Sequence, residues 1–398
     1  MTIIVLLILA GVSISLILDN NGIIQKSKDA RKGYRQAREN EQADLENASS
    51  WIDNQVNGSN GGSTKLSDAT EKTKPYLPTG YTKEEGTDLE HGLVIKDGAG
   101  NEYVWIEVPR TTDIYTTSGL NITEFLDSEL ESIENDLMNY VTDYRTDGCL
   151  DEWYSGCGIA DSNVYREKYN KMLKSVYNNG GFWIGRYEIG IDENTARYDN
   201  SSSTDKYTTT HSTDGQTPVI KPNKIPYNWI QGSQAEIMAE TFAPRGYTSS
   251  LMFGIQWNLL CKHLETKGIS QDIIKSNSTS YGNYNNSIFD VENLEAKYSE
   301  DSGTNWQEIN EEDSYHKEEN KSVLLTTGAD LRNSILNIYD IAGNLWELTL
   351  EKNSDGNNTI CGGSYTGNGA EDDVITTHGT TGRISTNTFN IGARVALY

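Results

Sequence analysis

The sequence contains too few cysteines to form a disulfide scaffold. Four cysteines in 398 residues cannot build a dense framework of cystines. Only Cys149 and Cys157 are near neighbours along the chain, so one bridge is open and none is required. A fold held together by many disulfides is therefore excluded.

Positive charge is also scarce. The chain has 33 Lys and Arg residues against 58 Asp and Glu residues, which gives a formal net charge of −25. A charge of this sign repels phosphate backbones and anionic membrane surfaces. Nucleic acid is therefore not expected as a partner.

Familiar catalytic motifs are missing as well. The five histidines form no HExxH pair and no two cysteines are spaced as CxxC, so no local zinc scaffold is present. Two Gly-x-Gly pairs, at 98–100 and 367–369, lack the third glycine of a dinucleotide loop, and no P-loop occurs. Thr366 stands where a hydrolase nucleophile elbow needs glycine. The motifs give no support for a zinc enzyme, a nucleotide-binding protein or a serine hydrolase.

The chain does contain one long apolar run. Residues 3–18 read IIVLLILAGVSISLIL without a charge. As a helix they would extend about 24 Å at ~1.5 Å per residue, against a hydrocarbon core of roughly 30 Å. The first basic residue is Lys26, so the basic start of a signal peptide is missing. We expect a membrane segment through residues 3–18, with a buried helix as the alternative.

A polar helix and a linker are expected next. A helical apolar stripe continues to about Val56, and residues 57–63 then read NGSNGGS, which disfavours helix. The sequence therefore predicts one helix over residues 1–56 and a flexible linker over 57–92. The run TIIVLLILAGVSISLIL followed by NNGIIQKSKDA resembles the N-terminus of bacterial type IV pilins. That resemblance implies membrane insertion or filament assembly with pilin-like partners.

The remainder reads as a mixture of helices and strands. Residues 93–95 and 103–108 flank a Gly-rich turn and predict a β-hairpin. Helical spacing recurs in an apparent insertion at about 111–180. Residues 277–321 are polar and acidic and show no core pattern. Further elements are expected as a strand at 182–189, helices at 231–242 and 251–267, and a closing strand at 391–397. The predicted fold class is α+β.

The segment NIYDIAGNLWEL, residues 337–348, combines two carboxylates with a tight turn. Asp340 and Glu347 flank Ala-Gly-Asn, whose carbonyl oxygens would be free, and oxygen ligands of this kind suit Ca²⁺. The alternative is structural, with Asp340 and Asn344 capping the turn through backbone N–H groups while Trp346 fills the core. Composition alone favours the structural alternative.

Several segments together resemble the formylglycine-generating enzyme, or sulfatase-modifying factor, family. They are GFWIGRYEIG, TPVIKPNKIPYNWI, SLMFGIQWNLL, NIYDIAGNLWELT, CGGSY and NIGARVALY, in the order expected of that family. The resemblance spans residues 93–398 and implies a variant of the C-type lectin fold. It also implies a structural Ca²⁺ held by the side chains of Asp340 and Glu347 and the carbonyls of Gly343 and Leu345.

The catalysis of that family is not expected here. Its oxidase members bind copper through two closely spaced cysteines near the C-terminus, but residues 364–390 of this chain contain no cysteine. Cys261 and Cys361 are far apart in sequence and are interpreted as inert core thiols. We therefore expect no copper and no enzyme activity. A retained oxidase would need these two cysteines to meet in space.

Residues 365–389 are instead predicted to bind a ligand. In C-type lectin folds the loops before the last strand form the exposed ligand surface, and here they carry short polar side chains. The pattern is similar to variable proteins of diversity-generating retroelements, which implies that the loop is diversified. The alternative is a polar loop without a ligand. The contacts expected are Tyr365, Asn368, Glu371, Asp372, His378, Arg383, Asn387 and Phe389.

Taken together, these features predict a non-catalytic recognition or adhesion protein on a bacterial cell surface. A membrane-anchored or filament-borne helix would present a calcium-stabilised domain outside the cell, where a glycan or a protein is the ligand. Two alternatives stay open: an oxidase that activates sulfatases, and a purely structural pilin-like filament subunit.

Overall fold

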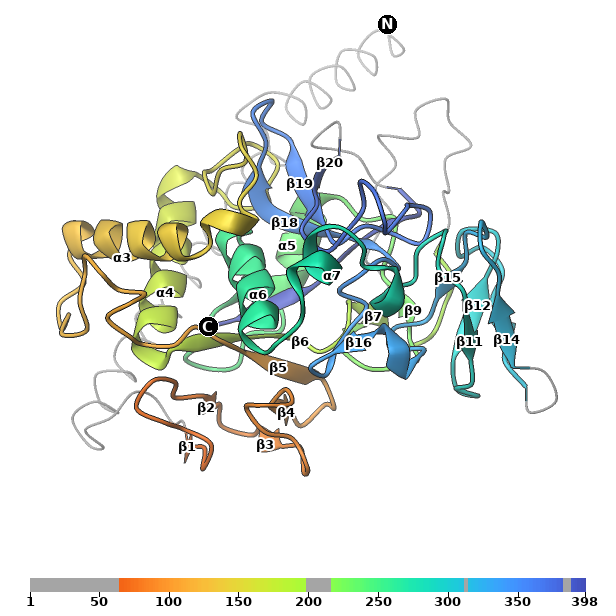
Figure 1. The fold of residues 1–398 in the computed structure, drawn as a ribbon, viewed down its shortest axis with the longest axis horizontal. Helices are drawn as coiled ribbons and strands as arrows, with labels where there is room; N and C mark the ends of the chain where they lie inside the picture. Colours follow the sequence, from red (N-terminus) through yellow and green to blue (C-terminus); the bar gives the residue numbers. More distant parts are fainter. Residues whose placement is uncertain (1–63, 198–215, 311–313, 382–387) are drawn as a thin grey trace, which may run out of the picture. The chain divides into compact units, whose positions relative to one another are not determined.

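The structure is a computed structural model that describes residues 64–197, 216–310, 314–381 and 388–398 (Figure 1). The predicted helix over residues 1–56, its apolar run and the NGSNGGS segment lie outside the described residues. None of the described helices is both long enough and apolar enough to cross a membrane. By its internal contacts, Ser63–Tyr398 forms one compact unit.

This unit combines helices with runs of short strands, as expected for an α+β protein. The helices are α3 (Asp127–Tyr140), α4 (Ser162–Asn179), α5 (Gly232–Glu240), α6 (Gly254–Thr266) and α7 (Gln271–Lys275), with 3-10 turns at Thr142–Tyr144, Thr279–Tyr281 and Leu331–Asn333. The strands up to α6 are β1 (Thr64–Lys65), β2 (Tyr76–Leu77), β3 (Thr82–Lys83), β4 (Val94–Lys96), β5 (Glu102–Glu107), β6 (Gly181–Gly185), β7 (Gly190–Ile191), β8 (Pro218–Val219), β9 (Ile225–Pro226) and β10 (Ser249–Leu251). The later strands are β11 (Phe289–Val291), β12 (Lys297–Ser299), β13 (Gln307–Glu308), β14 (Tyr315–Lys317), β15 (Leu324–Leu325), β16 (Ser334–Ile335), β17 (Ile338–Tyr339), β18 (Trp346–Lys352), β19 (Asn358–Cys361), β20 (His378–Thr380), β21 (Ile391–Ala393) and β22 (Val395–Leu397).

The largest sheet has six antiparallel strands in the order β10-β22-β6-β5-β4-β3. The predicted hairpin is confirmed as β4 and β5, with Ile95 opposite Tyr103. Trp105 of β5 lies opposite Trp183 of β6, and both indoles are buried. The C-terminal strand β22 pairs with β6, so the end of the chain is built into the centre of this sheet.

A second sheet of four strands has the order β20-β19-β18-β21. Its pair β18 and β21 is parallel, while β19 runs antiparallel to both β18 and β20. The closing strand expected at 391–397 is two strands, because the chain leaves this sheet after β21 and joins the six-stranded sheet as β22. Arg394 lies at the crossing, between the two sheets.

Two helices expected from their apolar spacing form part of the main core. In α4 the Asp161 side chain accepts hydrogen bonds from Asn163 N and Val164 N, and the helix ends at Gly180 with φ of +69°. Met172, Leu173 and Val176 of this helix have no exposed surface. Helix α4 packs on β6 and α6 packs on β5. The region 111–180 is therefore part of the core of this domain.

The linker prediction for residues 57–92 is wrong for its described part. Tyr76 is 6% exposed, packs edge-on against Trp105 and Trp183, and its hydroxyl donates to Leu397 O at 3.0 Å. Strand β3 also extends the six-stranded sheet. The NGSNGGS run ends at residue 63, and the apolar Leu66 and Tyr76 that follow it are buried. The domain therefore begins before residue 93.

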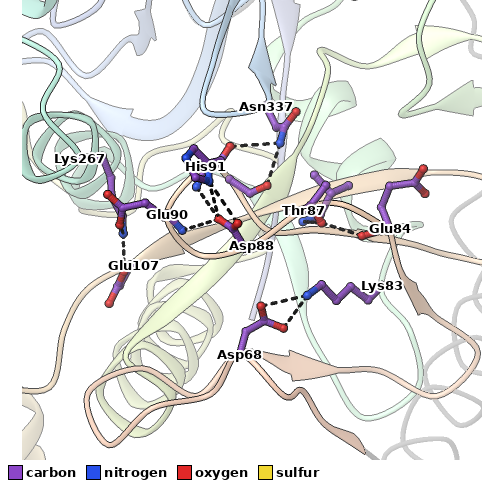
Figure 2. Close-up of polar contacts among 12 residues, drawn as sticks. Asp68, Lys83, Glu84, Thr87, Asp88, Glu90, His91, Glu107, Lys267 and Asn337 are labelled. Carbon is purple, nitrogen blue, oxygen red and sulfur yellow. Dashed lines mark hydrogen bonds and ion pairs between the residues drawn. The ribbon is translucent and has the colours of Figure 1, made fainter.

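Polar contacts fasten the same segment, as Figure 2 shows. Lys83 Nζ donates to both carboxylate oxygens of Asp68, at 2.9 and 2.7 Å. Asn337 Nδ2 donates to the carbonyls of His91 and Gly92, at 3.2 and 2.8 Å. These bonds link residues 68–92 to one another and to the turn after β16.

The polar stretch 277–321, which shows no core pattern in its sequence, forms strands in its described part. Strand β11 pairs with β14, and β12 pairs with β13 and β15. A small separate core lies between them, with Phe289, Val291 and Val323 among its buried residues. The apolar positions lie on strands of two or three residues, which are too short for their spacing to reveal a pattern.

Candidate functional site

Residues 340–347, the predicted calcium turn, centre on a buried ion pair. Arg394 Nε donates to both carboxylate oxygens of Glu347 at 2.9 Å, and Nη2 donates to Oε1 at 2.5 Å. The remaining donors of Arg394 reach Gly185 O at 2.8 Å and Tyr339 O at 2.7 Å. Arg394 therefore joins the turn to β6 and to β17 and neutralises Glu347.

Two further carboxylates lie near this ion pair. Glu188 accepts from Asn344 Nδ2 and from Leu345 N, both at 2.9 Å. Burial, followed by the charges of Asp340 and Glu347, raises the pKa of Glu188 well above its usual range. Burial also raises the pKa of Asp340 to about 7. One arginine thus faces three buried carboxyl groups.

The four predicted calcium ligands differ in how far they are already engaged. Glu347 is taken by Arg394, whereas Asp340 Oδ2 accepts from Gly328 N at 2.6 Å and Oδ1 is buried without a hydrogen-bond partner among the described residues. The turn itself is fixed, because a side chain at Gly343 would meet Asn283 O at 2.3 Å. Of the two side chains, only Asp340 has an oxygen without a hydrogen bond, and the calcium site remains a prediction.

The first part of the predicted ligand loop is firmly anchored. Asn368 Oδ1 accepts from Asn286 Nδ2 at 2.6 Å, and Asn368 N donates to Asp373 at 3.0 Å. Gly363 and Gly369 lie against the ring of Tyr284, where an added Cβ would come within 2.7 and 2.3 Å of ring carbons. The loop is therefore held in one conformation by the segment beneath it.

The structure separates the eight predicted contacts into groups. Glu371 and Asp372 are exposed, while Asn368 and Phe389 are half-buried. Arg383 and Asn387 lie outside the described residues. Tyr365 is 1% exposed and the side chain of His378 is 0% exposed, so the prediction that these two face a ligand is wrong. Tyr365 packs against Leu324 and Leu345, and His378 lies on β20 opposite Cys361 of β19, so both side chains are buried in the protein.

Aromatic side chains gather where this loop returns to the core. Tyr365 forms a buried cluster with Leu324 and Leu345, and Trp306 and Phe389 pack on it while staying partly exposed. Trp229 meets Phe389 edge-on with 6.0 Å between ring centroids, and it too is partly exposed. Sequence reasoning found Phe389 but missed both tryptophans. We call Trp229, Trp306 and Phe389 the aromatic patch.

Trp229 is held in an unusual backbone conformation. Its φ is +53°, a left-handed value that is costly for a bulky residue. Arg197 holds the neighbouring chain by donating to Asn228 O at 2.6 Å and to Trp229 O at 3.1 Å. Asn228 Nδ2 in turn donates to Phe389 O at 2.9 Å. The scaffold therefore fixes the position of this tryptophan and its neighbour Phe389.

A second polar cluster surrounds His378. Cys149, Glu351 and His378 each offer one atom that could bind a metal, and these three atoms lie within 4.8 Å of one another. Among the described residues, this is the group of His, Cys, Asp or Glu side chains that comes together in this way. His378 Nδ1 lies 2.6 Å from Glu351 Oε2, and Nε2 lies 3.2 Å from Asn258 Oδ1. Burial lowers the pKa of His378, but nearby Cys361 and Glu351 outweigh it and raise this pKa well above normal.

The cysteines of the domain are all free thiols. Cys149 and Cys157 do not form the bridge that their spacing left open. Cys261 and Cys361 are both buried, and burial raises the pKa of the Cys361 thiol to about 11 and that of Cys261 further. These two thiols are thus protonated at neutral pH when no metal is bound.

Comparisons with known proteins give no match. Protein-family models, curated proteins and solved structures were compared, and none is significantly similar to this chain.

Proposed function

We propose that this protein is a non-catalytic recognition protein whose ligand binds at the aromatic patch and the adjoining loop after Tyr365. The observation that carries the proposal is the gathering of three partly exposed aromatic side chains on a rigid support. Amphipathic aromatic rings on fixed backbone offer large contact area at low entropic cost. The expected ligand has an apolar face and hydrogen-bonding groups, as a sugar ring or a protein side chain does.

The backbone strain at Trp229 favours this interpretation. A bulky residue in the left-handed region costs of order 1–3 kcal/mol and persists where the surrounding structure enforces it, often at ligand sites. Arg197 and Asn228 supply that enforcement here. A surface that only covered the core would gain nothing from a strained and partly exposed tryptophan.

Polar groups next to the patch would supply specificity. Asn390 Nδ2 reaches Thr366 Oγ1 at 3.3 Å and so connects the exposed start of the loop to the residue after Phe389. From there the chain leads to Asn368 and to the exposed acids Glu371 and Asp372. These side chains would favour ligands that donate hydrogen bonds or carry positive charge.

The remaining expectations complete the proposal. From its sequence motifs, we propose that the domain adopts a formylglycine-generating enzyme variant of the C-type lectin fold and that a pilin-like helix over residues 1–56 displays it on a bacterial surface. The protonated, buried state of Cys261 and Cys361 supports a binding role over the oxidase alternative. Diversification of the loop by a retroelement belongs to the same proposal.

Glycan and basic-peptide arrays probed with the full-length chain test the proposal. We expect a defined subset of probes to be retained, and we expect Trp229→Ala and Trp306→Ala to lose at least about 30-fold in affinity, equivalent to ~2 kcal/mol for a central aromatic contact. Trp153→Ala is the matched control, because Trp153 is also partly buried but belongs to the segment between α3 and α4. Equal binding by all three variants, or retention of no probe, would contradict the proposal.

A further inference from the structure

The cluster of Cys149, Glu351 and His378 takes no part in the proposed recognition surface. It brings together three segments: Cys149 precedes the short bridge between Leu150 and Lys352, Glu351 lies on β18, and His378 opens β20. Strand β19 lies between the last two and places Cys361 directly opposite His378. Side chains from distant parts of the sequence therefore converge on one buried ring.

The ring nitrogens of His378 face two acceptors. Nε2 lies 3.2 Å from Asn258 Oδ1, so it donates its proton there. Nδ1 lies 2.6 Å from Glu351 Oε2, and an ionised carboxylate only accepts. Two lone pairs at this distance repel each other unless a positive charge lies between or beside them. A proton shared between the two atoms, carried by the imidazole or by the carboxyl, removes this repulsion, and so does a metal ion that takes the place of that proton.

Local charge favours a cation at this point. In the described chain the only cationic partner recorded for Glu351 is His378 itself, and no lysine or arginine pairs with it. Glu351 is 4% exposed, so water does little to stabilise its charge. By contrast, the buried Glu347 has a full guanidinium partner in Arg394. A divalent ion bound by the Glu351 carboxylate and a Cys149 thiolate would likewise leave the site without net charge.

We infer that Cys149, Glu351 and His378 form a zinc-binding site. A thiolate, an imidazole nitrogen and a carboxylate oxygen are the ligand types that Zn²⁺ takes, whereas Ca²⁺ and Mg²⁺ select oxygen alone. Binding would release the thiol proton of Cys149 and the second imidazole proton.

The surroundings orient the three ligands. Asn258 of α6 holds the remaining ring nitrogen, which is the usual arrangement for a metal-bound histidine. Asp151, two residues after Cys149, accepts from Gly254 N at 2.7 Å and from Ile255 N at 2.8 Å, and so fixes the loop that carries the thiol. Leu150 and Lys352 exchange both backbone hydrogen bonds, at 2.8 and 3.0 Å.

Zinc titration of the full-length chain tests the inference. The protein is purified in detergent, stripped with chelator, returned to excess Ca²⁺ and titrated with Zn²⁺ by calorimetry. We expect one Zn²⁺ per chain, at least about 100-fold weaker binding in Cys149→Ser, and 10- to 100-fold weaker binding in Asn258→Ala, which loses only the orienting contact. Cys157→Ser is the matched control, because Cys157 is a buried thiol outside the group, and its affinity is expected to be unchanged.

Cobalt gives a readout that does not depend on affinity. Co²⁺ bound at this site is expected to show a thiolate-to-cobalt charge-transfer band that Cys149→Ser abolishes and Cys157→Ser retains, with circular dichroism confirming that each variant is folded. Absence of Zn²⁺ binding, full affinity in Cys149→Ser, or a cobalt complex without the thiolate band would each overturn the inference. None of these results depends on whether the aromatic patch binds a ligand.

Discussion

The buried scaffold around the Arg394–Glu347 ion pair, here called the frame, and the loop that follows Tyr365 are close in sequence. They differ in whether their charged side chains are buried and hydrogen-bonded within the protein or exposed to solvent. In the frame, Arg394 and Glu347 are 1% exposed and their hydrogen bonds run to the protein interior. In the loop, Glu371 and Asp372 are exposed, and the bonds that hold the loop come from backbone and from Asn368 and Asp373.

This difference separates stability from recognition. Removing a buried partner leaves an uncompensated charge, whereas changing an exposed side chain usually alters stability by less than about 0.5 kcal/mol. The loop can therefore vary at its exposed positions without unfolding the domain. The predictions below test that separation, from the largest expected effect to the smallest.

Arg394→Met is expected to destabilise the domain most, by about 3–5 kcal/mol, because Glu347, Asp340 and Glu188 then share a buried site without a cation. Urea denaturation measures the loss. The double variant Arg394→Met, Glu347→Leu removes one of those charges together with its partner and should recover part of the stability. A single variant as stable as the parent would show that the frame does not depend on this pair.

Tyr76→Ala tests whether the described segment before residue 93 contributes to the stability of the domain. Tyr76 packs on two buried tryptophans, so we expect a loss of about 3–5 kcal/mol in the free energy of unfolding. Tyr76→Phe removes only the hydrogen bond to Leu397 O and should cost about 1 kcal/mol. If Tyr76→Ala matched the parent, residues 64–92 would be a linker after all.

The hairpin and two of the helices were predictable from sequence, while the cluster around His378 and the tryptophans of the aromatic patch were not. The spacing of β-rich residues around a Gly-rich turn indicated β4 and β5, and apolar periodicity indicated α3 and α4. Cys149 and His378 are 229 positions apart by their numbers, so no local motif announces their meeting. Trp229 and Trp306 likewise meet the loop through tertiary packing alone.

Burial was misjudged for a related reason. Tyr365 and His378 lie in a Gly-, Thr- and Asn-rich stretch, and local polarity suggested exposure. Tyr365 instead packs on Leu345 at the start of the next sheet, and His378 pairs across the sheet with Cys361. Whether a residue in an irregular segment is buried depends on what packs above it, which the local sequence does not contain.

His263, on α6, gives the stability of the domain a pH dependence that the exposed loop should lack. Burial lowers the pKa of His263 to about 3, and its Nδ1 accepts from Glu107 N at 3.2 Å, so the folded state holds it neutral. The stability that the neutral His263 contributes to the folded state is fully present above pH ~6.5. It is lost as the pH falls from there toward 3, at up to ~1.4 kcal/mol in the free energy of unfolding per pH unit.

Chemical denaturation at pH 7 and pH 5.5 measures this dependence. We expect the parent to lose about 1 kcal/mol more than His263→Gln over that interval, because the glutamine cannot take up a proton. A parallel pH dependence in the two proteins would mean that His263 takes up a proton as readily in the folded state as in the unfolded state.

Asp340→Asn distinguishes a calcium-binding role of Asp340 from a purely structural role in the turn. Asparagine tolerates the positive φ of +57° at this position and can accept from Gly328 N, so without calcium the change should cost less than about 1 kcal/mol. If Ca²⁺ is bound, the parent should melt at a higher temperature with Ca²⁺ than with chelator, and Asp340→Asn should lose that shift. No shift in the parent would remove calcium from the account.

The smallest change in stability is expected for substitutions in the loop. This measurement tests most directly whether the exposed loop residues can change without destabilising the domain. The triple variant Ala370→Ser, Glu371→Lys, Asp372→Lys changes three consecutive exposed positions, and Glu318→Lys, Glu319→Lys is the matched control at another exposed acidic pair. The measurement is the free energy of unfolding of the full-length chain in urea. The account predicts a value within about 1 kcal/mol of the parent for both variants, and a loss of more than about 3 kcal/mol confined to the loop variant would contradict it.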